Sequence, residues 1–253
     1  MFPDVCLSAR RPAFCVLHLH SPPTGHLRAS AHSLPPALPP SLPPSPGPSA
    51  HLSHTPRTSV NPTPTSAPAA INGPVAGIGL ALALFCDFRF TAREAKWTTA
   101  FSKLGLVAEH GTSWCLPRLV GTGKAMLMLM SSEVLLGEEA QRLGLAEKCF
   151  NKETLLDETI AFAQNLAATV PGGSLAAIKQ QVWRHPGMDQ DAALRQSNRL
   201  MSVSLDKAGD FKEGATAFMK KRRPDFPPLR ASHPLMRQLD KEFGAGNGGT
   251  SRL

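Results

Sequence analysis

Proline is concentrated in the first 69 residues, and this distribution limits how much of the chain can fold. Of the 24 prolines among 253 residues, 16 lie there, with six of the nine histidines and a single acid, Asp4. Such a segment cannot bury enough apolar surface to offset the entropy lost on ordering. We therefore predict a disordered segment over residues 1–66, a folded core over 67–228 with one hydrophobic centre, and a flexible tail over 229–253.

Charge, cysteine content and hydropathy narrow the class of protein. The formal net charge is +8, and the five cysteines form no C-x-x-C pair, which favours free thiols in a reducing compartment. The longest apolar run, Val75 to Phe85, is shorter than the roughly 20 residues of a membrane span, so we expect none. The basic run Lys220–Arg223 lacks interleaved aromatic residues, so nucleic acid is an unlikely partner, and an RNA-associated protein is the weakest alternative.

Apolar periodicity predicts an α/β fold with a helical C-terminal part. Short strands and helices alternate up to residue 150, and only helices are expected after it. The expected strands are 69–71, 88–91, 96–98 and 146–150. The expected helices are 79–86, one starting at Thr112 or Ser113 and ending at Gly121, 122–130, 137–144, 152–168, 174–183, 189–204 and 206–223.

A glycine-rich turn precedes the first apolar helix. Asn72-Gly73-Pro74 favours a tight turn, and the glycines at 77 and 79 let backbone approach a ligand. Ile78 lies between them at the helix start, where N–H groups have no intrahelical partner and can bind an oxyanion. On the loop alone, a packing turn explains the glycines equally well. A dinucleotide fingerprint is excluded, because the third glycine would fall on Leu82.

Glu109 is the candidate acid. It follows the apolar segment Leu104–Ala108 and precedes the helix start at Thr112. An apolar environment raises the pKa of a carboxyl group towards a value useful for a general base, whereas a helix N-terminus lowers it. The residues alone leave both outcomes open, and an exposed acid that stabilises the helix dipole is the alternative.

Five blocks in the same order resemble the crotonase, or enoyl-CoA hydratase/isomerase, superfamily. The resemblance covers residues 70 to about 226, and its blocks are INGPVAGIG, FCDFRFTAREAKW, FSKLGLVAEHGTSWCLPRLVG, GEEAQRLGLAEKCF and DFKEGATAFMKKRRPDF. It implies a partial crotonase-like ββα spiral with a helical C-terminal part. Within the family, the closest resemblance is to the peroxisomal Δ3,Δ2-enoyl-CoA isomerases.

The number of glutamates in the family pattern indicates which reaction the resemblance implies. Hydratases of this family use two glutamates, which would fall on Ala81 and Phe101, so both are absent here. Isomerases carry one glutamate in a pattern that resembles Leu104-Gly105 through Glu109 to Ser113. Glu109 would then move a proton from C2 to C4 of a 3-enoyl-CoA, while the Ile78 N–H holds the thioester oxyanion. The implied pathway is fatty-acid β-oxidation.

The resemblance also implies partners. Phe218 and Lys221 match positions that contact coenzyme A, often across a subunit boundary of a trimer-type homo-oligomer. Coenzyme A enters as part of the substrate, and neither a metal nor another cofactor is implied. The last three residues, Ser251-Arg252-Leu253, resemble a peroxisomal import signal read by an import receptor, with cytoplasm or mitochondria as alternatives.

The N-terminal half of the family pattern, which supplies a second oxyanion donor, has no counterpart in residues 1–69. The alternative hypothesis is therefore a truncated, catalytically impaired homologue that binds coenzyme A or associates with crotonase-like oligomers.

Overall fold

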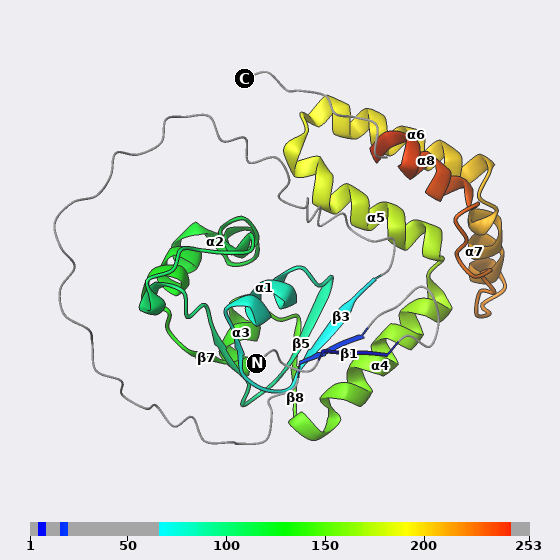
Figure 1. The fold of residues 1–253 in the computed structure, drawn as a ribbon. Helices are drawn as coiled ribbons and strands as arrows, with labels where there is room; N and C mark the ends of the chain where they lie inside the picture. Colours follow the sequence, from blue (N-terminus) through cyan, green and yellow to red (C-terminus); the bar gives the residue numbers. More distant parts are fainter. Residues whose placement is uncertain (1–4, 9–15, 20–65, 244–253) are drawn as a thin grey trace, which may run out of the picture. The chain divides into compact units, whose positions relative to one another are not determined.

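The computed structural model describes residues 5–8, 16–19 and 66–243, which form two β-sheets and a series of helices (Figure 1). The larger sheet has the strand order β1-β2-β3-β5-β8, and the smaller has the order β4-β6-β7. The larger sheet contains β1 (Val5–Ser8), β2 (Val16–Leu19), β3 (Pro68–Ile71), β5 (Phe88–Ala92) and β8 (Lys148–Phe150). The smaller contains β4 (Val75–Ala76), β6 (Lys96–Thr98) and β7 (Leu135–Leu136).

The chain passes repeatedly from one sheet to the other and then into a helix. β3 leads to β4 and α1, β5 leads to β6 and α2, and β7 leads through α3 to β8. Successive passes are in parallel register, with Ala70 opposite Phe90 and Val75 opposite Trp97. The helical segments of this part are α1 (Ile78–Leu84), the 3-10 helix η1 (Ser102–Leu104), α2 (Thr112–Ser131) and α3 (Gly137–Arg142). The predicted α/β spiral is present.

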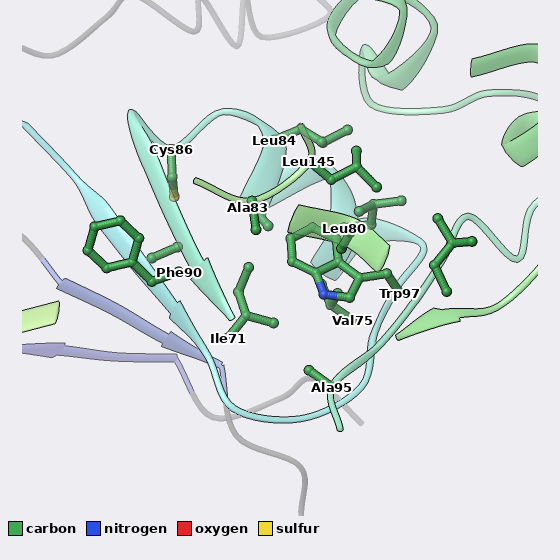
Figure 2. Close-up of a cluster of buried hydrophobic side chains, with 14 of the residues drawn as sticks. Ile71, Val75, Leu80, Ala83, Leu84, Cys86, Phe90, Ala95, Trp97 and Leu145 are labelled. Atoms are coloured by element: carbon green, nitrogen blue, oxygen red, sulfur yellow. The ribbon is translucent and has the colours of Figure 1, made fainter. Parts of the chain in front are cut away.

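The main core lies between these passes. β3 has no polar face, and Ala69, Ala70 and Ile71 are fully buried, as is typical of a parallel strand covered on both sides. Trp97 is also fully buried, and its Nε1–H donates to the Thr91 hydroxyl at 3.0 Å, which satisfies its only polar atom. Figure 2 shows its indole among the aliphatic side chains that α1 and the strands contribute.

A buried arginine connects β5 to the end of the spiral. The Arg89 guanidinium donates to the Cys86 and Leu145 carbonyl oxygens, each at 2.7 Å, and to the Glu147 carboxylate. Only 5% of its side chain is exposed, so these acceptors compensate for the hydration that it loses.

The remaining helices follow β8. α4 packs against β3 and β5, and α5, α6 and α8 surround a second, smaller apolar cluster (Figure 1). Their bounds are α4 (Lys152–Thr169), α5 (Gly172–Arg184), the 3-10 helix η2 (His185–Gly187), α6 (Gln190–Asp206), α7 (Asp210–Met219) and α8 (Pro234–Phe243). The predicted helical C-terminal part is therefore confirmed.

Two predicted boundaries need correction. The flexible tail proposed for residues 229–253 contains α8, whose Leu235 and Leu239 are buried against α5 and α6. Their spacing of four residues gives this helix one apolar stripe, which explains its docking. The segment 1–66, expected to be disordered, contains the strands β1 and β2, which extend the larger sheet. The Pro-rich run and residues 244–253 lie outside the described residues.

Gly121 interrupts α2, as its sequence position predicts. Its φ of 77° and ψ of 159° are non-helical, so the helix consists of two segments joined at this residue. Within the described part of the chain, no helix combines the length and the apolar character needed to cross a membrane.

Candidate active site

The glycine turn places a free backbone donor at the start of α1. Gly77 has φ +53°, which favours glycine, and a Cβ built there would be 3.9 Å from the Phe101 ring. α1 begins at the next residue, Ile78, and no hydrogen bond found among residues 66–243 uses the Ile78 N–H. The predicted oxyanion donor is therefore available, at the helix end where the dipole favours negative charge.

Glu109 lies in the turn between η1 and α2, where two consecutive residues are left-handed, Gly111 at φ 75°, which glycine adopts readily, and His110 at φ 53°. The Glu109 carbonyl oxygen accepts hydrogen bonds from the Thr112 N–H at 3.0 Å and the Thr112 hydroxyl at 2.7 Å. The helix starts at Thr112, as predicted, but Gly111 is the N-cap and no side chain caps the helix, because the Thr112 hydroxyl donates to this carbonyl instead. These bonds hold the turn while leaving the carboxylate free.

The environment of the Glu109 carboxylate differs from the apolar setting that its neighbours suggested. Its side chain is 36% exposed, and the His110 Nε2 lies 3.7 Å from its Oε2. Leu104 and Val107 are 71% and 77% exposed, so they do not cover the acid. Apolar neighbours along a turn need not be neighbours in space, and of the two outcomes that the residues left open, the structure shows the exposed acid.

The turn that carries Glu109 packs beside α1, the helix that begins at Ile78. The glycine two residues after Glu109, Gly111, packs against Phe85, since a Cβ on it would be 3.1 Å from the Phe85 Cζ. Phe85 is the C-cap of α1, whereas Ile78 is its first residue. A helix of seven residues is about 10 Å long. The predicted donor and the turn that carries the predicted acid thus both lie beside one short helix.

The two positions that resemble the glutamates of hydratases are closed to solvent. Ala81 is 2% exposed on α1, and Phe101 is 3% exposed beside Gly77. Neither can supply a proton or orient water. Glu109 is therefore the candidate catalytic acid of this site.

The predicted coenzyme A contacts lie at the end of α7, on the surface. Phe218 is 85% exposed, and its carbonyl oxygen accepts the Lys221 N–H at 3.1 Å. Lys221 has φ 50° and is exposed, so the ring and the ammonium group lie one turn apart and are free for a partner. Neither lines either of the two cavities formed beside α5.

A cavity lies elsewhere, at the C-terminal end of α1. It has a volume of about 550 Å³ and is bounded by α1, β5, α2 and α5. Neither Glu109 nor Ile78 lines it. Sequence reasoning missed it, although Leu175, Ile178 and Val182 already show helical spacing on one face of α5.

Three ionisable side chains that line this cavity are either paired or uncharged. Lys179 and Asp87 form an ion pair at 2.8 Å with 10% and 12% of their side chains exposed, and the Ala67 N–H also donates to Asp87. Burial raises the pKa of the Cys115 thiol to about 11, so it is protonated at neutral pH. Cys86, Cys115 and Cys149 are free thiols, and no group of three or more metal-ligating side chains occurs within residues 66–243.

Known proteins that are similar to this chain in sequence are named as CoA isomerases and hydratases. The protein of Escherichia coli (strain K12) named 1,2-epoxyphenylacetyl-CoA isomerase is 38% identical over 160 residues, which are 62% of this chain and 59% of that protein. The crotonyl-CoA hydratase of Syntrophomonas wolfei subsp. wolfei (strain DSM 2245B / Goettingen) is 37% identical over 164 residues, which are 62% of this chain and 60% of that protein. The chain thus spans about three fifths of the length of these relatives.

A solved structure shows the same fold. The enoyl-CoA hydratase from Bacillus anthracis matches with a TM-score of 0.61 at 28% identity, over 66% of this chain and 64% of that one. The crotonase-like spiral is thereby confirmed, whereas a special closeness to peroxisomal isomerases is not shown, because hydratases and an isomerase are matched alike. The enoyl-CoA hydratase/isomerase family model matches residues 58–228, so the chain belongs to this family.

Proposed function

We propose that the protein isomerises the double bond of an acyl-CoA, converting a 3-enoyl-CoA to a 2-trans-enoyl-CoA, as in fatty-acid β-oxidation. The observation that carries this proposal is the pair of buried apolar side chains at Ala81 and Phe101. Adding water across a double bond in this family takes two acids at those positions, whereas moving a proton between two carbons takes one. Glu109 is an accessible acid on the adjacent turn.

The residues can divide the reaction as follows. The Glu109 carboxylate removes a proton from C2, and the electron pair of that C–H bond forms the enolate of the thioester. The Ile78 N–H donates to the enolate oxygen, and losing a donor of this kind typically costs on the order of 3 kcal/mol. The enolate oxygen then re-forms the thioester carbonyl, the C1=C2 pair moves to form the C2=C3 double bond, and the C3=C4 pair takes the proton from Glu109 at C4.

The test is conversion of 3-enoyl-CoA by the purified full chain. Glu109→Gln keeps the shape of the side chain but removes the base, so kcat falls about 100-fold or more. Glu158→Gln is the matched control, because Glu158 is an exposed acid on α4 outside the site, and it keeps full activity. Hydration of 2-enoyl-CoA by the wild type at a comparable rate would overturn the isomerase assignment.

A second function is favoured by the open surroundings of Glu109. Its apolar neighbours are exposed, which suits a binding subunit without turnover. We propose in that case that Phe218 and Lys221 contact coenzyme A within a trimer-type assembly. Sedimentation with and without coenzyme A, combined with a null activity assay, distinguishes this function from the first.

The proposed location is the peroxisome. The residues that suggest it, Ser251-Arg252-Leu253, lie outside the described part of the chain. A fluorescent reporter that carries the last 12 or so residues should concentrate in peroxisomes, and a diffuse cytosolic signal would disprove the address.

A further inference from the structure

The cavity at the C-terminal end of α1 has the properties of a ligand site. Its volume of about 550 Å³ falls in the range of small-molecule pockets, and most of its lining is apolar. The lining comes from segments far apart in the sequence, among them Phe88 on β5, Leu119 on α2 and Ile178 on α5. Because Glu109 and Ile78 are absent from the lining, the cavity is separate from the proposed reaction site.

Two stacked tryptophan rings, Trp114 and Trp183, line one side of the cavity, and Phe85 continues the stack outside the lining. Phe85 stacks on Trp183 at 5.8 Å between ring centroids, and Trp183 stacks on Trp114 at 5.6 Å with an interplanar angle of 13°. These rings come from α1, α5 and α2, so their contacts hold three helices around the opening. Aromatic side chains offer a large rigid apolar surface, and their ring edges favour contact with another aromatic ring.

The charges of the lining favour an anion. Arg89, Lys179 and Arg118 line the cavity, against one carboxylate, Asp87. The Asp87 charge is balanced by Lys179 at 2.8 Å, and Arg89 is bound to Glu147, which lies outside the lining.

Arg118 has no carboxylate partner among residues 66–243. Its guanidinium lies 3.8 Å from the centroid of the Trp114 ring, and its Nη1 donates to the Trp114 carbonyl oxygen at 2.7 Å. A guanidinium has five N–H donors, so most of them are left for a ligand. It is therefore placed at the aromatic wall with donors to spare, in a lining whose charge is positive.

We propose that this cavity binds an aromatic carboxylic acid. The ring of the ligand packs against the apolar lining beside Trp114 and Trp183, and its carboxylate pairs with the Arg118 guanidinium, an interaction that guanidinium geometry favours. The site is independent of coenzyme A and of Glu109, so it does not depend on the proposed isomerase activity.

The probe for the test is 1-naphthaleneacetate, and the readout is calorimetric titration of the full chain. Arg118→Gln should weaken binding about tenfold, because it removes a charge-assisted hydrogen bond. The neutral analogue 1-naphthaleneethanol should bind the wild type and Arg118→Gln equally. Equal affinity of Arg118→Gln and the wild type for the acid would overturn the carboxylate assignment.

A second pair of variants tests the location. Val182→Phe adds bulk at the cavity lining, and Val134→Phe adds the same bulk at an exposed valine outside it. Since the two valines are 67% and 55% exposed, neither change threatens the fold, which urea unfolding checks. Binding should be lost in Val182→Phe and kept in Val134→Phe. Loss in both, or in neither, would overturn the site.

NMR and competition complete the test. The indole N–H signals of Trp114 and Trp183 should shift on titration, and that of Trp97, which is buried outside the lining, should not. Free coenzyme A should not displace the acid, and Glu109→Gln should bind it as the wild type does. Displacement by coenzyme A, or binding of decanoate as tight as that of the aromatic acid, would overturn the proposal.

Discussion

The main core and the turn that carries Glu109 contain similar apolar residues but treat them in opposite ways. In the core, Trp97 and Ile71 are fully buried, whereas Leu104 and Val107 beside Glu109 are 71% and 77% exposed. A strand that pairs with a strand on each side is shielded from solvent by the elements around it. The turn at Glu109, which contains two left-handed residues, lies on the surface, and only one of its sides packs against the protein. Apolar character in the sequence therefore predicts burial only where the topology supplies a second layer. The Glu109 surface is open to an acyl chain or another subunit.

The largest expected effect tests the core side of this comparison. Trp97→Ala removes a fully buried ring and leaves the Thr91 hydroxyl without its indole partner, so we expect a loss of about 3–5 kcal/mol in the free energy of unfolding. Val107→Ala, on the exposed turn, should change it by about 0.5 kcal/mol or less. Urea unfolding of both variants measures the difference. Equal losses would show that Val107 is covered in solution.

The comparison also explains what the sequence could predict. The buried strand β3 and helices α1 to α7 were predictable, because period and turn residues mark them locally. The exposure of Glu109 was not, because Leu106 and Val107 precede it in sequence yet face solvent. The strands β4 and β7 have two residues each and carry no periodicity of their own.

Sites assembled from distant segments were also beyond prediction. The aromatic stack joins Phe85, Trp114 and Trp183, which are separated by 29 and 69 residues in the chain, and no local pattern connects them. The docking of α8 likewise depends on partners in α5 and α6. Ile78 and Glu109 were candidates from the glycine turn and the lone acid, and the family resemblance gave them their roles, whereas their placement beside α1 became visible only in three dimensions.

A smaller change in the free energy of unfolding is expected at two glycines, one closely packed and one on an open helix surface. A Cβ at Gly137, where α3 begins, would lie 1.9 Å from the Ala92 carbonyl oxygen, so Gly137→Ala forces the backbone of β5 and α3 apart. We expect a loss of about 1–3 kcal/mol. Gly123→Ala on α2 meets nothing within 4 Å and should stabilise the chain by about 0.5–1 kcal/mol, because glycine weakens a helix interior. Thermal or urea unfolding distinguishes them, and two changes of the same sign would contradict this difference in packing.

The smallest effect concerns the buried thiol of Cys115. Burial raises its pKa from 9.0 to about 11, so the unfolded chain releases this proton at lower pH than the folded chain does. The stability that the thiol contributes is complete below pH 9 and is lost as the pH rises towards 11. By pH 10, the free energy of unfolding of the wild type should fall by about 1 kcal/mol more than that of Cys115→Ala.

Cys149 is the control for this pH effect, since it is only half-buried on β8. Its pKa is also raised by burial, but nearby Arg93 opposes the change, so Cys149→Ala should follow the wild type more closely across this pH range. Urea titrations between pH 8 and 10 compare the three proteins. Parallel curves for the wild type and Cys115→Ala would mean that water reaches the Cys115 thiol. The cavity that Cys115 lines would then be open to solvent, as the turn at Glu109 is. In that case, the buried core would not include the part of α2 that carries Cys115.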